Sequence, residues 1–296
     1  MASKVKANEI IINFEDEGVE DNVIFVHGYG DNCKMWWNQL ATPAFTKYWR
    51  LWAVDIRGCG GTERPKTDYS MDTLMKDFVQ FWRMGRAQVA ADLEKFEEMA
   101  WVKTNPVVVG YSMGGRIALE YAIRYPRDVR ALVLVSSGVG LPRPEPTAEE
   151  QKQRDEMTAL LKKGDIKKWA EMMTTNAFSP GFKQKNPKVF EKYKKIKTEQ
   201  KPDALLRLRE GMASASTTPD LSRLTMPVLI IVGENDAHMG PEQGKKAQEA
   251  IPGSKLVVLP TGHASPIEEP EQFNSALLEF INEVKKTVPS GVDVET

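Results

Sequence analysis

The chain has 296 residues and a mass of 33.3 kDa, which suits one large α/β domain or two small domains. Its hydrophobic content of 41% is ordinary for a globular protein with a substantial core. A net charge of −1 excludes a strong overall field that would recruit nucleic acid or an anionic membrane, so we expect a small-molecule substrate.

The N-terminal twenty residues contain no uninterrupted apolar core of signal-peptide length, and no later run approaches the length of a membrane span. The two cysteines, Cys33 and Cys59, are too few for a disulfide framework and suit a reducing compartment. We therefore expect a cytoplasmic protein that does not bind membranes. The sequence predicts no oligomeric state.

Short apolar runs rich in β-branched residues recur along the chain, separated by segments of helical periodicity. Continuous runs of this kind are typical of strands that are buried on both faces of a mostly parallel sheet. The pattern predicts strands at residues 9–14, 22–27, 50–55, 106–110, 129–136, 226–233 and 255–260. We expect the first of them to be an antiparallel edge strand. The sequence thus predicts an α/β fold whose central sheet is flanked by helices.

Helical periodicity is clearest in three segments of the chain. Apolar residues recur at helical spacing from Asp72 to Ala100, which predicts one long helix or two helices broken near Gly85. Helices are also predicted at residues 112–125 and 270–286, the latter opened by a proline at a first-turn position.

Strand-like runs disappear between Leu141 and Ser222, where several helical segments follow one another. Prolines at the start of this segment favour an extended entry, and Thr147 with Glu150 predicts a capping box. Lysine-rich stretches such as residues 185–197 are interpreted as solvated helix faces. The predicted domains are a core at residues 1–140 and 223–288, an all-helical insertion at 141–222 and a loose tail at 289–296.

The stretch "VVVGYSMGGRIALEYA" at residues 107–122 places Ser112 where a predicted strand turns directly into a helix. Such a turn exposes the serine hydroxyl and directs free helix N–H groups toward the same point. The turn strains the serine backbone and requires small neighbours, which Gly110, Gly114 and Gly115 provide. We therefore predict that Ser112 is a nucleophile; the alternative is a purely structural turn.

A serine nucleophile needs a general base, and the chain has three histidines: His27, His238 and His263. His263 follows the last predicted strand, which brings it to the same sheet edge as Ser112, and the order serine, acid, histidine is the one that this type of turn uses. His263 is therefore the predicted base. His27 is interpreted as a ring packed beneath the site, and His238 as a residue at the mouth of the site or on a surface loop.

The base in turn needs a carboxylate to fix its tautomer. Asp236 lies in the loop after the strand predicted at 226–233, far enough from the strand end for its side chain to reach sideways. Glu234 is the competing carboxylate, but it lies closer to the strand end. The sequence therefore predicts Asp236 as the orienting acid.

With this serine, acid and histidine in this order, the chain resembles members of the α/β-hydrolase superfamily, of the capped esterase and lipase-like kind. The matching motifs are "HGYG" at 27–30, "DIRGCGGT" at 55–62, "GYSMGG" at 110–115, "GENDA" at 233–237 and "GHASPIEEPEQF" at 262–273. The resemblance implies an oxyanion hole made by the backbone N–H groups of Tyr29 and Met113. It also implies that the helical insertion is a lid, and that Asp55, Arg57 and Gly58 form a structural turn.

The predicted activity is hydrolysis of a small carboxylic ester or lactone through an acyl-enzyme, which requires no metal or organic cofactor. The same three residues would also serve a carbon–carbon bond hydrolase acting on diketones, a thioesterase or a cofactor-free perhydrolase. A small-molecule receptor with slow turnover is the alternative from another class. Candidate substrate-pocket residues are His27, Gly28, Trp82, Trp169, Met173 and His238. For the two tryptophans and Met173, packing in a helical core is the competing interpretation.

Overall fold

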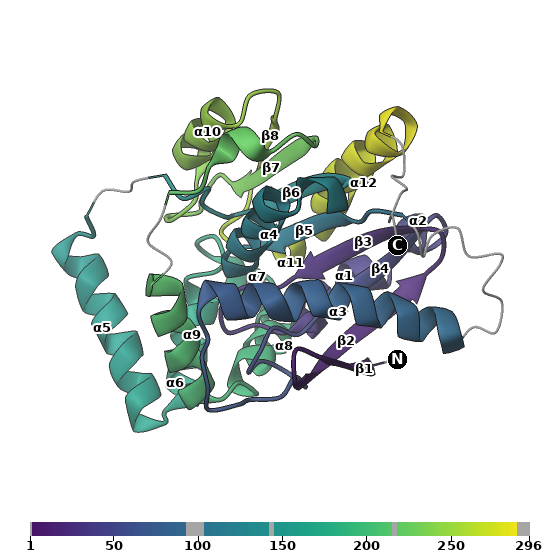
Figure 1. Cartoon of the computed structure of the whole chain (residues 1–296). Helices are drawn as coiled ribbons and strands as arrows, with labels where there is room; N and C mark the ends of the chain where they lie inside the picture. The colour runs from purple at the N-terminus through teal and green to yellow at the C-terminus, as the bar shows by residue number, and fades with distance from the viewer. Residues whose placement is uncertain (1, 93–103, 142–144, 215–217, 289–296) are drawn as a thin grey trace.

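In the computed structural model, residues 2–92, 104–141, 145–214 and 218–288 are described, and eight strands within them form a single sheet (Figure 1). The strand order is β1-β2-β4-β3-β5-β6-β7-β8. β1, β2 and β4 pair in antiparallel fashion, whereas every pair from β4 to β8 is parallel. The strands are β1 (Ala2–Ala7), β2 (Ile10–Gly18), β3 (Asp21–Val26), β4 (Trp49–Val54), β5 (Val107–Tyr111), β6 (Ala131–Val135), β7 (Val228–Gly233) and β8 (Lys255–Leu259).

Every strand predicted from residue 22 onward coincides with an observed strand to within two residues at either end. The prediction that the first apolar run forms the edge is wrong, because β1 precedes β2 and pairs with it along its outer side. In β1, Val5 and Ala7 are buried while Lys4 and Lys6 point to solvent. This half-buried alternation is typical of an outer antiparallel strand.

Alternate residues of the central strands bury two separate cores, one on each face of the sheet. In β3, Ile24 and Val26 belong to one core, whereas Val23 and Phe25 belong to the other, and all four are fully buried. The first face is covered by α3 (Met71–Asp92), α4 (Met113–Arg124) and α10 (Pro241–Ala250). The opposite face is covered by η1 (Cys33–Trp36), α1 (Trp37–Leu40), α11 (Ser265–Glu268) and α12 (Pro270–Thr287). Burial of both faces explains the continuous apolar runs.

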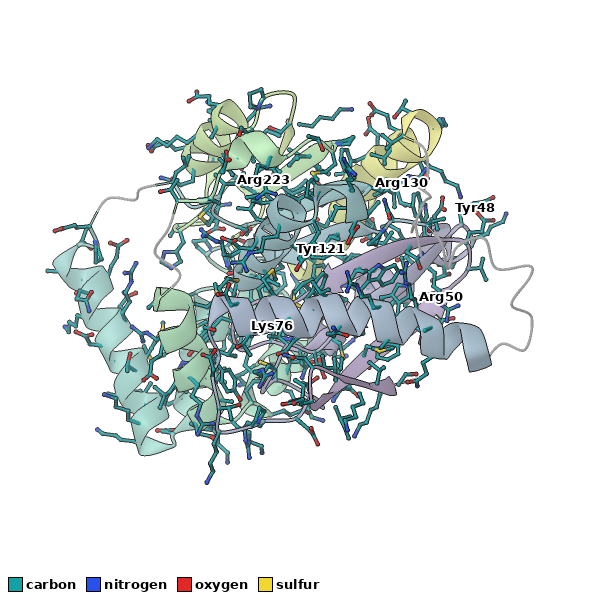
Figure 2. The ribbon with its side chains drawn as sticks, viewed as in Figure 1. Tyr48, Arg50, Lys76, Tyr121, Arg130 and Arg223 are labelled. Carbon is teal, nitrogen blue, oxygen red and sulfur yellow. The ribbon has the colours of Figure 1, made fainter. Side chains whose placement is uncertain are left out.

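The long helix predicted from Asp72 is α3, which continues through Gly85 without a break. The part of that prediction beyond Asp92 lies outside the described residues. α3 packs on α4, where the rings of Phe78 and Tyr121 meet edge to face at 4.9 Å; Figure 2 shows Tyr121 between these two helices. Ser112, the predicted nucleophile, lies at the N-terminus of α4, so the packing of α3 on α4 helps to hold it in place.

A helical insertion separates β6 from β7, and its first two helices and its last helix lie on the left in Figure 1. Thr147 and Glu150 form the predicted capping box at its first helix. Its own small core includes Leu160, Trp169 and Leu205. The helices of the insertion are α5 (Ala148–Lys163), α6 (Ile166–Thr175), α7 (Phe182–Lys185), α8 (Pro187–Thr198) and α9 (Pro202–Ser214).

The remaining short helices are α2 (Pro43–Thr46), η4 (Pro126–Asp128) and η5 (Leu221–Arg223). Before β6, Arg130 donates hydrogen bonds to the carbonyls of Lys285 and Val288 at the end of α12 and pairs with Asp21 at 3.0 Å (Figure 2). This cluster lies at the amino ends of the strands, opposite the end where β5 meets Ser112. Throughout the described ranges, helices long and apolar enough to cross a membrane are absent.

Candidate active site

Ser112 occupies a strained turn between β5 and α4. Its backbone has φ of 52° and ψ of −115°, a conformation that side-chain-bearing residues rarely adopt. Hydrogen bonds hold this conformation: the N–H of Ser112 donates to Val135 at 2.9 Å, and its carbonyl accepts from Gly115 N–H and from the Ser137 hydroxyl. The turn is thus fixed from β6 and α4 together, and the serine side chain is held at the end of the sheet.

The three glycines around Ser112 are required by close contacts. A Cβ atom at Gly110 would lie 2.5 Å from the carbonyl oxygen of Gly114, and one at Gly114 would lie 2.3 Å from the carbonyl oxygen of Val26. At Gly115 it would lie 2.3 Å from Cβ of Ser137. Side chains therefore have no room at these positions, because the sharp turn presses the start of α4 against β3 and the loop after β6.

His263 lies between Ser112 and Asp236, so the structure brings the three predicted residues together. Nδ1 of His263 lies 2.6 Å from Oδ2 of Asp236, and Nε2 lies 2.9 Å from Oγ of Ser112. An ionised carboxylate only accepts hydrogen bonds, so Nδ1 carries the proton that it donates to Asp236. In a neutral ring Nε2 then accepts from the Ser112 hydroxyl, which is the arrangement a general base needs.

Asp236 is held in its ionised form by its partners. Its Oδ1 accepts backbone N–H groups of His238 at 2.9 Å and Met239 at 3.0 Å. Burial alone favours the protonated carboxyl, but the hydrogen bond and charge of His263, together with the two N–H groups, hold the pKa of Asp236 below its usual value of 3.8. Glu234, the competing carboxylate, directly follows β7, and its side chain is exposed.

The loop that carries His263 is tied to the helical insertion. The N–H of Ala264 donates to the carbonyl of Ala177 at 2.8 Å. Glu268 accepts the Gly262 N–H at 2.8 Å and also binds the N–H and hydroxyl of Ser179. These contacts fix the histidine loop against the segment between α6 and α7, so the position of the imidazole depends on the insertion as well as on β8.

His27 lies beneath the site and outside its wall. Its Nδ1 donates to the carbonyl of Gly28 at 2.8 Å and its Nε2 accepts the N–H of Ile56 at 3.0 Å. Burial lowers the pKa of His27, because the charged ring would lose its water and would also lose the Ile56 hydrogen bond. His27 is thus packed beneath the site, as expected. At the neighbouring Gly28, a Cβ atom would lie 2.8 Å from the ring of Tyr111.

A cavity of about 630 Å³ opens over Ser112 and His263. Tyr29 and Met113, the predicted oxyanion residues, lie in its wall, as do Met173 and His238. Met113 is the first residue of α4, so no carbonyl of its own helix can accept its backbone N–H. Further wall residues come from the insertion, including Met157, Asn176, Lys197 and Met212.

The two tryptophans expected at the pocket do not line it, and neither do His27 and Gly28. Trp82 faces the sheet from α3, where its ring meets Trp52 edge to face at 5.7 Å. Trp169 is buried in the core of the insertion, with its ring 5.9 Å from that of Tyr29. Large aromatic rings gain more from full burial than from lining an open cavity, which explains both positions.

The sequence patterns do not indicate that Asp31 and Lys197 lie in the cavity wall. The lysine-rich pattern predicts a solvated side chain for Lys197, which is wrong: this side chain is only 2% exposed and pairs with Asp31. The available signal was its spacing: Lys197 lies seven residues after Phe190 and four after Tyr193, both buried, so it falls on the apolar face of α8. Asp31 directly follows the glycine-containing motif at 27–30.

The chain matches a family model described as alpha/beta hydrolase fold over residues 21–270. It is 25% identical over 273 residues to 3-oxoadipate enol-lactonase 2 of Acinetobacter baylyi, covering 92% of this chain and 93% of that protein. It is 27% identical to 2-hydroxymuconate semialdehyde hydrolase of a Pseudomonas species, covering 95% of this chain and 93% of that protein.

The fold is also similar to solved structures. A thermophilic esterase from Thermogutta terrifontis aligns with a TM-score of 0.76 and 26% identity, over 96% of this chain and 99% of the esterase. An enol-lactonase from Burkholderia xenovorans aligns with a TM-score of 0.78 over 95% of this chain and all of that one; at 20% identity this likeness concerns the fold alone. Both alignments span the sheet and the insertion.

Proposed function

This chain belongs to the alpha/beta hydrolase fold family, and we propose that it is a serine hydrolase that cleaves a small carboxylic ester or lactone. The observation that carries the proposal is the continuous hydrogen-bonded series from Asp236 through His263 to Ser112, with distances of 2.6 and 2.9 Å; Ser112 and His263 lie in the wall of the cavity. A serine hydroxyl becomes a useful nucleophile when a positioned base takes its proton, and this series supplies that base.

In the proposed acylation step, Oγ of Ser112 attacks the carbonyl carbon while its proton passes to Nε2 of His263. The imidazolium that forms is stabilised by Asp236, to which Nδ1 already donates its hydrogen bond. His263 then donates the proton to the leaving oxygen, and the carbon–oxygen bond of the ester or lactone breaks. Because the hydrogen bonds exist before substrate binds, little reorganisation is needed at this step.

The carbonyl oxygen gains negative charge in the tetrahedral intermediate, and the backbone N–H groups of Tyr29 and Met113 are the proposed donors to it. Removal of one such donor from a serine hydrolase costs about a hundredfold or more in rate. Support for Met113 comes from its place as the first residue of α4, at the positive end of the helix dipole. Support for Tyr29 comes from its place in the cavity wall.

The acyl-enzyme is resolved by water. His263, again neutral after leaving-group departure, accepts a proton from a water molecule as that water attacks the acyl carbon. The proton then returns to Ser112 when the carboxylic acid is released, and the serine is regenerated. The same imidazole thus acts as base and acid in both half-reactions.

The size of the substrate is supported by the cavity and by the relatives. A volume of about 630 Å³ lies within the range of small-molecule sites. Two relatives with sequence similarity along most of the chain are named an enol-lactonase and an esterase. We therefore propose a small ester or lactone as the substrate class. In this proposal the helices that follow β6 form a lid over the acyl group. The lid in this proposal has the boundaries 141–222, and the two flanking segments form the core.

Carbon–carbon bond hydrolysis is the second candidate. It is favoured by the 27% identity to 2-hydroxymuconate semialdehyde hydrolase across 95% of this chain. Both reactions use attack on a carbonyl and stabilisation of an oxyanion, so the same three residues serve either one. A substrate comparison separates the two candidates.

The proposed experiment compares short acyl p-nitrophenyl esters, lactones and vinylogous diketones as substrates of the wild-type protein and of Ser112→Ala. We expect the esters or lactones to be turned over many times, and Ser112→Ala to lose at least a thousandfold in kcat, as about 10⁶-fold losses are known for triad serines. Ser275→Ala is a matched control, since Ser275 is exposed on α12. Faster cleavage of diketones than of esters would favour the second candidate, and full activity of Ser112→Ala would rule out both.

A further inference from the structure

A buried ion pair joins the helical insertion to the loop that carries Tyr29. Nζ of Lys197 in α8 lies 2.5 Å from Oδ1 of Asp31, and the two side chains are 2% and 1% exposed. Both residues also lie in the wall of the cavity above Ser112. The loss of solvation when two charges are buried is often larger than the attraction between them. The reaction proposed above uses neither residue. The pair therefore needs an explanation.

The carboxylate of Asp31 lies within the turn of the proposed oxyanion donor. Asp31 follows Tyr29 by two residues, and its N–H donates to the carbonyl of Gly28 at 3.2 Å, which closes the turn. A Cβ atom placed at Gly28 would lie 3.1 Å from Oδ2 of Asp31, so the carboxylate folds back against the start of the same turn. A negative charge thus lies in the same turn as the Tyr29 N–H group, the proposed donor to the oxyanion.

Lys197 and Tyr193 surround this carboxylate from one face of α8. The hydroxyl of Tyr193 donates to Oδ2 of Asp31 at 3.1 Å, while the Lys197 ammonium binds Oδ1 and lies 4.4 Å from the centre of the Tyr193 ring. The phenol of Tyr193 also lies close to that of Tyr111, the residue before Ser112. The insertion therefore reaches both the oxyanion turn and the serine turn through one cluster.

An unpaired carboxylate at this position would oppose the reaction. Charges inside a protein interact more strongly than in water, so an isolated negative charge beside Tyr29 would repel the oxyanion as it forms. We propose that Lys197 is a positioning residue that neutralises Asp31 and thereby allows negative charge to develop at the Tyr29 N–H. This inference rests on the serine hydrolase function proposed above and adds the insertion to its catalytic apparatus.

A role limited to anchoring the insertion makes a different prediction. If the ion pair only holds α8 against the loop, breaking it from either side removes the same anchor, and Lys197→Met and Asp31→Asn should be equally harmful. Charge neutralisation predicts an asymmetry. Lys197→Met leaves a negative charge beside the oxyanion, whereas Asp31→Asn leaves an ammonium or a neutral amine, neither of which opposes it.

The experiment measures kcat and KM for p-nitrophenyl acetate with the single variants Lys197→Met and Asp31→Asn and with the double variant. All variants are assayed at the same pH, toward the alkaline end of the activity profile. We expect Lys197→Met to lose about tenfold or more in kcat with KM changed less than about twofold, and Asp31→Asn and the double variant to lose clearly less kcat than Lys197→Met. Lys195→Met is the matched control, because Lys195 is exposed on the same helix.

A second readout reports the oxyanion directly and does not depend on how well each variant folds. A trifluoromethyl ketone adds to the serine hydroxyl and forms a tetrahedral adduct with a negatively charged oxygen. Its inhibition constant should rise in Lys197→Met by the same factor by which kcat falls, with concentrations corrected by active-site titration. Recovery of both values in the double variant would support neutralisation.

Three outcomes overturn the inference: equal loss of kcat in both single variants, a rise in KM without a loss of kcat in Lys197→Met, or no recovery in the double variant. A rise in KM alone would indicate that Lys197 binds the ground-state substrate. Ser112→Ala, assayed in parallel, separates this result from the proposed function. If that variant is inactive and Lys197→Met matches the wild type, only the role of Lys197 fails; if Ser112→Ala is active, the hydrolase mechanism itself fails.

Discussion

Nδ1 of His263 lies 2.6 Å from Oδ2 of Asp236, whose other carboxylate oxygen accepts two backbone N–H groups of the loop after β7. Asp236 therefore cannot rotate away without losing three hydrogen bonds at once. The imidazole is held with Nε2 toward Ser112, and a loop that follows β7 sets the orientation of a side chain that follows β8. The predictions below begin with this contact.

Substitution of Asp236 by asparagine should lower kcat by about a thousandfold or more, because an amide NH₂ group facing Nδ1 favours the wrong imidazole tautomer. KM should change little, since Asp236 does not reach the substrate. Steady-state ester hydrolysis measures both values. Glu234→Gln is the control in the same loop and should remain within about twofold of wild type, because Glu234 is exposed. Equal losses in the two variants would contradict the assignment of the acid.

The buried His27 predicts acid sensitivity of the fold. Its pKa in the folded protein is lowered by burial, whereas the unfolded chain takes up a proton below about pH 6.5. The unfolded state then binds more protons, so the free energy of unfolding should fall as the pH drops below 6.5 and level off below the folded pKa, with a slope of at most about 1.4 kcal/mol per pH unit.

Urea unfolding of wild type and His27→Gln at several pH values between about 7.5 and 5 tests this slope. The slope should shrink in the variant. Asp236 does not contribute in this window, because its lowered folded pKa places the loss of its stabilisation below its usual value of 3.8. An unchanged slope in His27→Gln would show that another group causes the acid sensitivity.

Substitution of Gly114 by alanine should destabilise the protein and disturb the serine turn. The added Cβ would lie 2.3 Å from the carbonyl oxygen of Val26, a backbone atom that cannot move aside cheaply. We expect a loss of about 1–3 kcal/mol in unfolding free energy together with a lower kcat. Gly85→Ala is the matched control: its Cβ would meet Phe81 at 3.5 Å inside α3, so it should raise stability by about 0.5–1 kcal/mol. Thermal and urea unfolding compare the two.

The ion pair between Arg57 and Asp77 should be structural, as expected for the turn after β4. Arg57 donates two hydrogen bonds of 2.6 and 2.7 Å to Asp77 in α3, and both side chains are about 95% buried, at 5% and 6% exposure. Asp77→Ala leaves the guanidinium buried without its carboxylate, which costs about 3–5 kcal/mol. Asp72 lies on the same helix as Asp77, but it is exposed and pairs with Arg124 of α4. Asp72→Ala should therefore cost less than about 1 kcal/mol of unfolding free energy. Similar losses in both would contradict the burial argument.

The sheet could be predicted from the sequence because its central strands are buried on both faces, as the five fully apolar residues of β6 show. The apolar pattern does not predict β1, because its lysines alternate with small apolar residues and it becomes a strand by pairing with β2. Ser112, Asp236 and His263 could be placed together because each follows a strand of one parallel sheet, whose carboxyl ends meet at one edge.

The pocket could not be predicted in the same way. Its wall combines residues from the core with residues from the insertion, and the packing between helices decides which side of each helix faces the cavity. Trp82 and Trp169 are candidates both for the pocket and for a helical core on sequence grounds, and both pack into cores. The lysine-rich sequence around Lys197 predicts a solvated side chain, although its spacing from Tyr193 places it on the buried face of α8.

Ser112 is proposed to form a covalent acyl-enzyme, with His263 as its base. Rapid mixing of the protein with p-nitrophenyl acetate, followed by acid quench and mass spectrometry of peptides, tests it most directly. We expect one acetyl group on Ser112, formed in a burst equal to the enzyme concentration, and its absence in Ser112→Ala and, at short times, in His263→Ala. Continued hydrolysis at the wild-type rate by Ser112→Ala, or acetyl groups found only at other residues, would contradict it.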